Sequence, residues 1–186
     1  MNILKSLILI FSFFYLTDAS AQPVGKKYTF KEIGWTITLS GDFTAFPSAD
    51  QSVHIQQNQK PNDQSSSKRL ILAMKDANTF SVNLSSCDIH DKHAGDIFSE
   101  SNKHSYSVAS QAEGTQCDTV TTTVSIDGVA FRNFRMITKK NSQIRESYES
   151  LYTCYNGYAI YITLAYFSKK TGEELKSMLE QSKFSR

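Results

Sequence analysis

The segment Tyr158–Phe167 constrains the fold most, because apolar side chains occupy both of its faces. Successive side chains of a strand point to opposite faces of a sheet. One set here consists of Tyr158, Ile160, Ile162, Leu164 and Tyr166, and the other of Ala159, Tyr161, Thr163, Ala165 and Phe167. A strand that is apolar on both faces is usually covered on both. We therefore expect Tyr158–Phe167 to be a central strand of a sheet with packing layers on both sides.

A tight turn and two further strands precede this segment, so that Gly128–Phe167 is predicted to be three antiparallel strands in a row. Asn156-Gly157 is a pair that two-residue hairpin turns favour, because both turn positions need positive φ. The strand before this turn, Ile144–Cys154, alternates in polarity and is expected to be half buried. In the first strand the apolar phase slips after Phe131, which predicts a β-bulge near Arg132–Asn133.

The rest of the chain predicts further strands and a polar loop. Alternating residues indicate a hairpin over Tyr28–Leu39 that turns at Ile33-Gly34. We expect Phe43 and Phe46 to pack back onto the sheet. Residues 48–68 are rich in polar residues and predict a solvated loop. Additional strands are expected at Leu70–Lys75, Thr79–Leu84 and Cys117–Ile126.

Two helices complete the predicted elements. The first spans residues 94–112, and its apolar stripe is Ile97, Val108 and Ala112, with Phe98 and Ala109 beside it. The second begins with a capping box, formed by Thr171 and Glu174. Its apolar stripe is Leu175, Met178 and Leu179, with Phe184 just beyond.

This order of elements predicts an α+β fold, with one mainly antiparallel sheet and helices packed on its faces. Residues 22–186 have the length of one domain. The polar loop at 48–68 could be a linker, but too few residues precede it to make a separate domain. We therefore expect a single domain over residues 22–186.

Residues 1–21 have the features of a secretory signal peptide. Lys5 is the charged residue, Ser6–Leu16 is the apolar core, and Ala19-Ser20-Ala21 is an A-x-A cleavage site. We expect cleavage between Ala21 and Gln22, and a mature protein in the periplasm or outside the cell. An uncleaved anchor is the alternative, but Ser6–Leu16 is too short to span about 30 Å of hydrocarbon. No later stretch of the sequence has the length of a transmembrane segment, so none is expected in the mature chain.

The charge balance argues against some classes of partner. The formal net charge is +2, from 20 basic and 18 acidic residues. Proteins dedicated to nucleic acid or to anionic membrane surfaces carry a clear excess of basic residues. We therefore expect no nucleic-acid partner.

The three cysteines permit at most one internal disulfide. Cys117 begins a predicted strand and Cys154 ends another, so they lie near opposite ends of the sheet, roughly 30 Å apart. That separation exceeds the ~7 Å limit between the Cα atoms of a disulfide. Cys87 follows an earlier strand and can lie level with Cys154, so Cys87–Cys154 is the favoured pair. Three unpaired, buried thiols are the alternative.

Four stretches of sequence resemble known proteins: FKEIGWTITLSGDF, LILAMKDANTFSVNL, SIDGVAFRNF and YNGYAIYITLAYFSKKTGEELKSMLEQSKF. Together they resemble a group of small, uncharacterised exported bacterial proteins and, more distantly, the Mog1/PsbP-like fold. Relatives often carry a proline where Ser40 stands. The resemblance implies a Mog1/PsbP-like α/β/α sandwich. It also implies a binding or assembly role, with no shared catalytic centre to place on this chain.

The densest polar cluster lies in the loop Cys87–Asp96. Its metal-ligand candidates are His90, Asp91 and His93, because imidazole and carboxylate groups bind transition metals. No known metal-binding spacing is present, and Asp/His segments also join strands to helices without binding anything. If Cys87 is in a disulfide, the loop loses a further candidate ligand.

Two other sets of residues are candidate surfaces. The tyrosines Tyr148, Tyr152 and Tyr155 could contact a protein or a glycan, although cross-strand packing is the more common role of such residues. The basic residues Arg132, Arg135, Lys139, Lys140 and Arg145 lie among aromatic residues and could bind phosphate. Strand edges and hairpin tips also carry such residues for solubility.

The sequence contains no G-x-S-x-G, P-loop, G-x-G-x-x-G or helix-borne histidine pair. We therefore expect no enzyme and no cofactor. The first functional hypothesis is an exported, non-enzymatic binding or accessory domain with an unknown protein or glycan partner. The second is a metal- or small-ligand-binding protein that uses the Cys87–Asp96 loop. A small hydrolase is the third.

Overall fold

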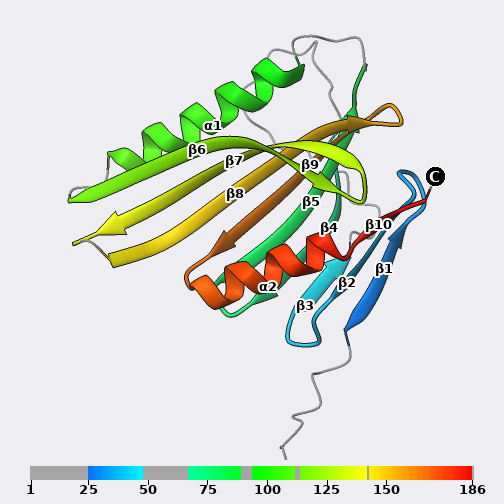
Figure 1. Ribbon diagram of the computed structural model, residues 1–186, viewed down its shortest axis with the longest axis horizontal. Coiled ribbons are helices and arrows are strands. Elements are labelled where there is room, and N and C mark those ends of the chain that lie inside the picture. Colours follow the sequence, from blue (N-terminus) through cyan, green and yellow to red (C-terminus); the bar gives the residue numbers. More distant parts are fainter. Residues whose placement is uncertain (1–24, 48–66, 89–93, 112–113, 142, 186) are drawn as a thin grey trace, which may run out of the picture.

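The computed structural model describes residues 25–47, 67–88, 94–111, 114–141 and 143–185. Within them, the strands form two antiparallel sheets, and a helix lies on each side of the larger sheet (Figure 1). The smaller sheet has the order β1-β2-β10, with β1 at Lys26–Phe30, β2 at Trp35–Leu39 and β10 at Lys183–Phe184. The larger has the order β3 (Thr44–Pro47), β4 (Lys68–Lys75), β5 (Asn78–Ser86), β9 (Tyr158–Tyr166), β8 (Gln143–Tyr155), β7 (Val129–Lys140) and β6 (Thr115–Ile126). The helices are α1 (Ala94–Ser110) and α2 (Lys169–Glu180).

Strand β9 lies between β5 and β8, in the middle of the larger sheet, as predicted. Ile160, Ile162 and Leu164 face the main core, which α2 and the smaller sheet cover. On the opposite face, Ala159 and Tyr161 belong to a second apolar cluster together with residues of α1 and β7. The α+β class, with helices on both faces of an antiparallel sheet, is therefore confirmed.

The expectation of one sheet is wrong, because β1 and β2 do not extend the larger sheet. They form the hairpin predicted at Tyr28–Leu39, in which Phe30 pairs with Trp35 and Gly34 has a φ of +63°. Trp35, Ile37 and Leu39 are all buried in the main core. The hairpin buries these alternate residues by packing over the face of the larger sheet instead of adding to its edge.

The bulge expected near Arg132–Asn133 is also absent from β7. Its register with β6 is unbroken from Val129 to Lys140, and its register with β8 shifts only between Thr138 and Lys139. The apolar phase slips because the strand contributes to both cores. Phe131 is buried in the main core, whereas Phe134 and Met136 are buried in the second cluster on the other face.

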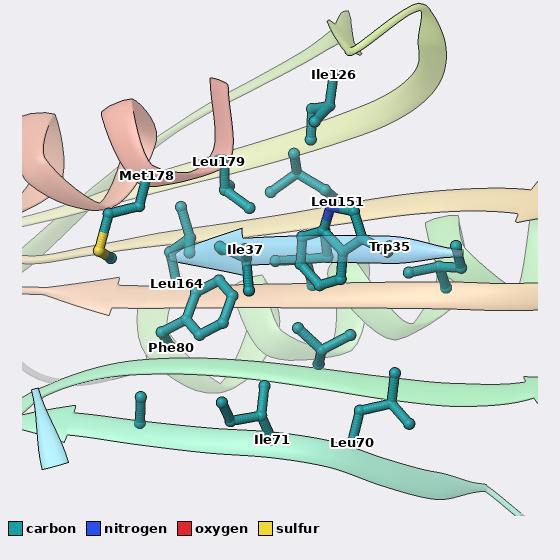
Figure 2. Close-up of a cluster of buried hydrophobic side chains, with 14 of the residues drawn as sticks. Trp35, Ile37, Leu70, Ile71, Phe80, Ile126, Leu151, Leu164, Met178 and Leu179 are labelled. Carbon is teal, nitrogen blue, oxygen red and sulfur yellow. The ribbon is translucent and has the colours of Figure 1, made fainter. Parts of the chain in front are cut away.

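The main core is centred on Trp35, which is completely buried (Figure 2). Its ring stacks with Phe30 at 5.7 Å and with Phe184 at 5.9 Å between centroids. Its indole Nε1 donates a hydrogen bond to Ser182 Oγ at 2.9 Å. Phe184 therefore belongs to β10 and the aromatic stack, and does not continue the apolar stripe of α2 as predicted.

Helix α2 begins earlier than the predicted capping box. Its N-cap is Ser168, whose Oγ accepts a hydrogen bond from the backbone N–H of Thr171 at 3.1 Å. Glu174 is therefore too far into the helix to cap it. Its carboxylate instead accepts from Ser40 Oγ at 2.5 Å and from Lys75 Nζ at 3.0 Å. The predicted apolar stripe is correct, because Leu175, Met178 and Leu179 are all buried.

The apolar face predicted for helix α1 is confirmed in part, for the side chains that the structure describes. Phe98 is buried and Ala109 packs against the second cluster, whereas Val108 is 59% exposed. Asn102 is also buried. Similarly, Phe43 packs into the core as expected, whereas Phe46 on β3 is 53% exposed.

Three expectations lie wholly or mostly outside the described residues: the signal peptide at residues 1–21, the polar loop at 48–68 and the end of the first helix beyond residue 111. In the part that is described, neither helix has the length and hydropathy needed to cross a membrane.

Candidate functional site

The structure contains a disulfide between Cys87 and Cys154, the pair that the sequence favoured, with Cα atoms 6.1 Å apart. Strands β5 and β8 both flank β9, so the residues that end them lie together beside the turn Asn156-Gly157. The backbone N–H of Cys87 donates to the carbonyl of Gly157 at 3.0 Å. Cys117 is a free, partly buried thiol at the start of β6.

The metal candidates His90, Asp91 and His93 lie outside the described residues. Cys87 is no longer available as a ligand, because the disulfide holds it. In the segments that the structure describes, no group of three or more histidine, cysteine, aspartate or glutamate residues is placed to hold a metal ion.

The three candidate tyrosines do not form one surface. Tyr152 is only 6% exposed and packs between Phe98 and Tyr161 in the second cluster. Tyr148 is partly buried against the same cluster. Tyr155 has the opposite parity on β8 and packs edge-on against Phe184, with 5.1 Å between centroids. Tyr152 thus has a packing role, whereas Tyr148 and Tyr155 lie on opposite faces of the sheet and are each partly exposed, so a partner surface on these two residues stays a prediction.

The basic residues of β7 make ion pairs within the sheet. Lys139 Nζ lies 2.5 Å from Asp118 Oδ2 on β6. Arg135 Nε lies 3.5 Å from Glu149 Oε1 on β8. The second pair is unusual because the Glu149 side chain is only 5% exposed. This ion pair is part of a polar cluster around Glu149 that no sequence motif indicated.

A cavity of about 170 Å³ lies between α2 and strands β6 to β9. Its apolar wall consists of Ile126, Leu151, Leu164 and Leu179, all of which Figure 2 labels around the main core. Its polar wall consists of Asn133, Glu149 and Lys176, and its remaining lining is Val124, Ser125 and Glu180. The cavity therefore combines an apolar wall with one buried carboxylate and its partners.

Glu149 is the centre of this polar wall. Its Oε1 accepts from Tyr166 Oη at 2.6 Å and lies 2.7 Å from Lys176 Nζ. Arg135 Nε is the third group beside the same oxygen. A buried carboxylate needs such partners, because loss of hydration penalises its charge. The cluster thus fixes β7, β8, β9 and α2 relative to one another.

The polar atoms around the second carboxylate oxygen of Glu149 have fewer hydrogen bonds. Glu149 Oε2 has a long contact of 3.5 Å with Asn133 Nδ2. Asn133 itself is 8% exposed, and its Oδ1 is buried with no hydrogen-bond partner within the described residues. Buried polar atoms nearly always have a partner. Asn133 is one of the residues that line the cavity, so a buried acceptor without a partner among the described residues lies close to this space.

Tyr166 links this cluster to α2. Burial, the hydrogen bond to Glu149 and the charge of Glu149 together raise the pKa of Tyr166 to about 12. Its ring lies against Gly172, where an added Cβ would collide with Cε2 and Cζ of the ring. A residue without a side chain is thus required at this turn of α2, despite the cost of glycine in a helix.

We expect protein stability to fall at high pH because of Tyr166. The folded state holds the phenol proton more tightly than the unfolded chain, so stability is unaffected below the ordinary pKa near 10. As pH rises from 10 towards 12, the free energy of unfolding should fall by up to about 1.4 kcal/mol per pH unit. Urea unfolding at about pH 8 and about pH 11 measures this fall.

The matched control is Tyr166→Phe. This variant should be less stable at neutral pH by about 1 kcal/mol, since it loses the hydrogen bond to Glu149. Its loss of stability between about pH 8 and about pH 11 should be smaller than that of the parent protein. Equal losses in the two proteins would contradict the assignment to Tyr166.

No protein-family model and no curated protein matches this sequence. Solved structures do resemble it. The cyanobacterial PsbP protein CyanoP from Synechocystis sp. PCC 6803 superposes with a TM-score of 0.55 at 11% sequence identity, over 87% of this chain and 93% of CyanoP. The chain has a PsbP-like fold. LpqN of Mycobacterium tuberculosis, described as involved in cell envelope biogenesis, gives a TM-score of 0.48 at 10% identity, over 87% of this chain and 91% of LpqN. A protein from Bacteroides thetaiotaomicron gives 0.49 at 9% identity, over 87% of this chain and 49% of that protein.

The resemblance to the Mog1/PsbP-like fold is thus confirmed as a structural one. At this level of identity the likeness extends to the fold alone. The polar cavity is a property of the residues that this chain places within the PsbP-like fold. One residue could have indicated the cavity from the sequence. Glu149 lies two positions before Leu151 on β8, so both side chains point to the same face of the sheet, and both are buried.

Proposed function

We propose that this protein is an exported, non-enzymatic binding domain, and that its ligand site is the cavity beneath α2. The observation that carries the proposal is Asn133, which lines a cavity of about 170 Å³ and whose buried Oδ1 has no hydrogen-bond partner among the described residues. Concave, mostly apolar cavities with a few polar groups are the usual form of small-molecule sites.

The contacts of Glu149 support binding in preference to catalysis. Lys176 and Tyr166 both lie within 2.7 Å of Oε1, so this oxygen is already engaged. A general base needs a carboxylate that can take a proton from the substrate. No cysteine or histidine is among the residues that line the described cavity. Glu149 is therefore better suited to hold the site together than to transfer protons.

The lining indicates the chemistry of the ligand. A cavity of 150 Å³ can hold a molecule of the size of benzene. Asn133 Oδ1 and Glu149 Oε2 are acceptors, so the ligand should carry a hydroxyl or amide N–H donor. Lys176 and Arg135 already compensate the charge of Glu149, so a neutral ligand is favoured. We infer a small neutral molecule with a donor group on an apolar body.

Export is supported by the leader-like residues 1–21 and by the Cys87–Cys154 disulfide, since disulfides persist mainly in oxidising compartments. Fractionation of the native cells, followed by mass spectrometry of the purified protein, tests this part. We expect a chain that starts at Gln22 in the periplasm or the medium. A full-length chain with both cysteines reduced in the cytoplasm would overturn it.

Ligand binding is tested by two-dimensional NMR of the oxidised mature protein, titrated with phenol, benzyl alcohol, benzamide and toluene. We expect saturable shifts at residues of the cavity. Because toluene has no donor for the Asn133 acceptor, it should bind at least about tenfold more weakly than phenol or benzamide. Absence of saturable shifts with every probe, or equal affinity for toluene, would overturn the proposed site.

Two variants sharpen this test. Asn133→Leu keeps the side-chain volume but removes the acceptor, so it should abolish the preference for donor-bearing probes. Val124→Trp narrows the cavity and should weaken the binding of every probe. Val120→Trp is its matched control, because Val120 is a 50% exposed residue of the same strand and parity that does not line the cavity. Equal effects of the two tryptophan variants would contradict the location of the site.

A further inference from the structure

Strand β6 is an edge of the larger sheet. It pairs with β7 over twelve consecutive residues, from Thr115 to Ile126, and within the described part of the chain no strand pairs with its other side. The opposite edge, β3, has only four residues and includes Pro47. A long edge strand exposes a row of backbone N–H and C=O groups that can pair with another chain.

The devices that usually block such pairing are missing from residues 119–126 of β6. Residues 119–126 (TVTTTVSI) contain no charge, proline or glycine. No bulge interrupts the register with β7. The side chains from Asp118 to Thr123 are all exposed, and Val120 is 50% exposed. Edge strands are normally protected by lysine, proline, bulges or short length. Strand β6 therefore has the properties of a pairing surface.

The sequence of β6 also indicates which strand can pair with it. The run Val120-Thr121-Thr122-Thr123-Val124 reads the same in both directions about Thr122. If two copies pair antiparallel about a two-fold axis at Thr122, Val120 of one copy faces Val124 of the other. Thr121 then faces Thr123, and Thr122 faces its own counterpart. Such β-branched and threonine pairs stabilise antiparallel strands.

The same register avoids unfavourable pairs at the ends of the strand. Asp118 falls opposite Ile126 of the second copy, so no like charges oppose one another within β6. A self-complementary patch of this kind is what a two-fold symmetric dimer requires. Helix α1 runs beside β6 (Figure 1) and carries exposed Tyr106 and Val108. Two copies of α1 would flank the seam on one face of the joined sheet.

We propose that β6 pairs antiparallel with β6 of a second copy of this chain, centred on Thr122, and joins the two seven-stranded sheets into one. The seam is mainly backbone pairing along a single strand, so it belongs to the smaller class of interface. The dimer should therefore be reversible, with a dissociation constant in the micromolar range, about 1 to 100 µM. This proposal does not depend on ligand binding, although Val124 belongs both to the seam and to the lining of the cavity.

The first test is sedimentation velocity of the oxidised mature protein between about 1 and 500 µM, a range that brackets the expected affinity. We expect monomer at the lowest concentration and dimer at the highest. Cys117→Ser should dimerise equally well, because the two Cys117 residues would lie at opposite ends of the seam, about 30 Å apart. A protein that stays monomeric over the whole range, or that dimerises only through Cys117, would overturn the proposal.

The second test uses charge at the two-fold axis. Thr122→Lys places two like charges directly opposite one another, as does Thr122→Glu, so each variant alone should be monomeric at the concentration where the parent is a dimer. An equal mixture of the two variants should restore the dimer. Thr44→Lys, at an exposed threonine of the other edge strand, is the matched control and should dimerise normally.

Unchanged circular dichroism and thermal unfolding of each variant separate loss of pairing from loss of folding. Thr122→Cys, made in the Cys117→Ser background, gives a further readout. Facing Cα atoms in an antiparallel pair are about 4.5 to 5.5 Å apart, which suits a disulfide. We expect a covalent dimer on mild oxidation. Failure of both the cross-link and the mixed-charge dimer would exclude this register.

Discussion

Replacement of Trp35 with alanine is expected to lower the free energy of unfolding by about 4 to 5 kcal/mol. Truncation of a large buried aromatic residue costs about 3 to 5 kcal/mol, because a cavity remains where the side chain was. Trp35 is completely buried and also stacks with Phe30 and Phe184, and aromatic pairs contribute about 0.5 to 1.5 kcal/mol each. The loss should lie at the upper end of the range, because Trp35 belongs to the main core, to which both sheets contribute residues.

Urea unfolding followed by circular dichroism measures this effect. Fluorescence cannot be compared directly, because Trp35 is the only tryptophan in the chain. Trp35→Phe is the matched control: it keeps an aromatic ring but leaves Ser182 Oγ without its indole donor, so it should cost about half as much. A loss below about 1 kcal/mol for Trp35→Ala would show that the smaller sheet does not depend on this side chain.

Removal of the Cys87–Cys154 disulfide is expected to lower the free energy of unfolding by about 4 kcal/mol. The two cysteines are separated by 67 residues, and a closed loop of that length restricts the unfolded chain by roughly that amount in the chain-entropy treatment. The loop contains α1 and strands β6 to β8, so the bond limits the freedom of about a third of the chain. The double variant Cys87→Ser/Cys154→Ser measures the loss in urea.

Cys117→Ser is the control for this prediction, because Cys117 is a free thiol on the edge strand. It should change stability by less than about 1 kcal/mol, because Cys117 is only partly buried, against the second cluster. Dithiothreitol should destabilise the parent protein and leave the double variant unchanged. Equal stability of the oxidised and reduced parent protein would contradict the prediction.

Features of the fold that depend on local pattern could be predicted from the sequence. The apolar residues on both faces of Tyr158–Phe167 identified a central strand, since such a strand must be covered on both sides. The pair Asn156-Gly157 identified a hairpin, and φ is positive at both residues. The cysteine pairing followed from the same reasoning, because it needed only the order and direction of neighbouring strands.

Other features depend on contacts between distant residues and could not be predicted. The smaller sheet includes β10, which places Phe184 beside Trp35 from the other end of the chain, and no local pattern reveals this pairing. The change in apolar alternation after Phe131 looks the same in a sequence in two cases. Either a bulge shifts the strand, or a second apolar layer covers its other face. The start of α2 was misplaced because Ser168 and Thr171 are both good N-cap residues, and tertiary contacts of Glu174 decide between them.

The candidate site was missed for a related reason. Glu149 on β8 looked like an ordinary polar residue of a half-buried strand. Its partners come from β7, β9 and α2: Arg135, Tyr166 and Lys176. Each lies on a different element, so spacing along the chain carries no signal. The metal and tyrosine hypotheses were built on residues close together in sequence, which is where motifs can be recognised.

The smaller sheet also has a consequence for the order in which the chain can fold. Strand β2 is synthesised early, but its second neighbour, β10, comes only after α2, and the backbone N–H of Ser185 donates to the carbonyl of Gly34. Until residues 183–185 have emerged, Trp35 lacks one of its two stacked rings. A nascent chain therefore cannot complete its core ahead of these residues.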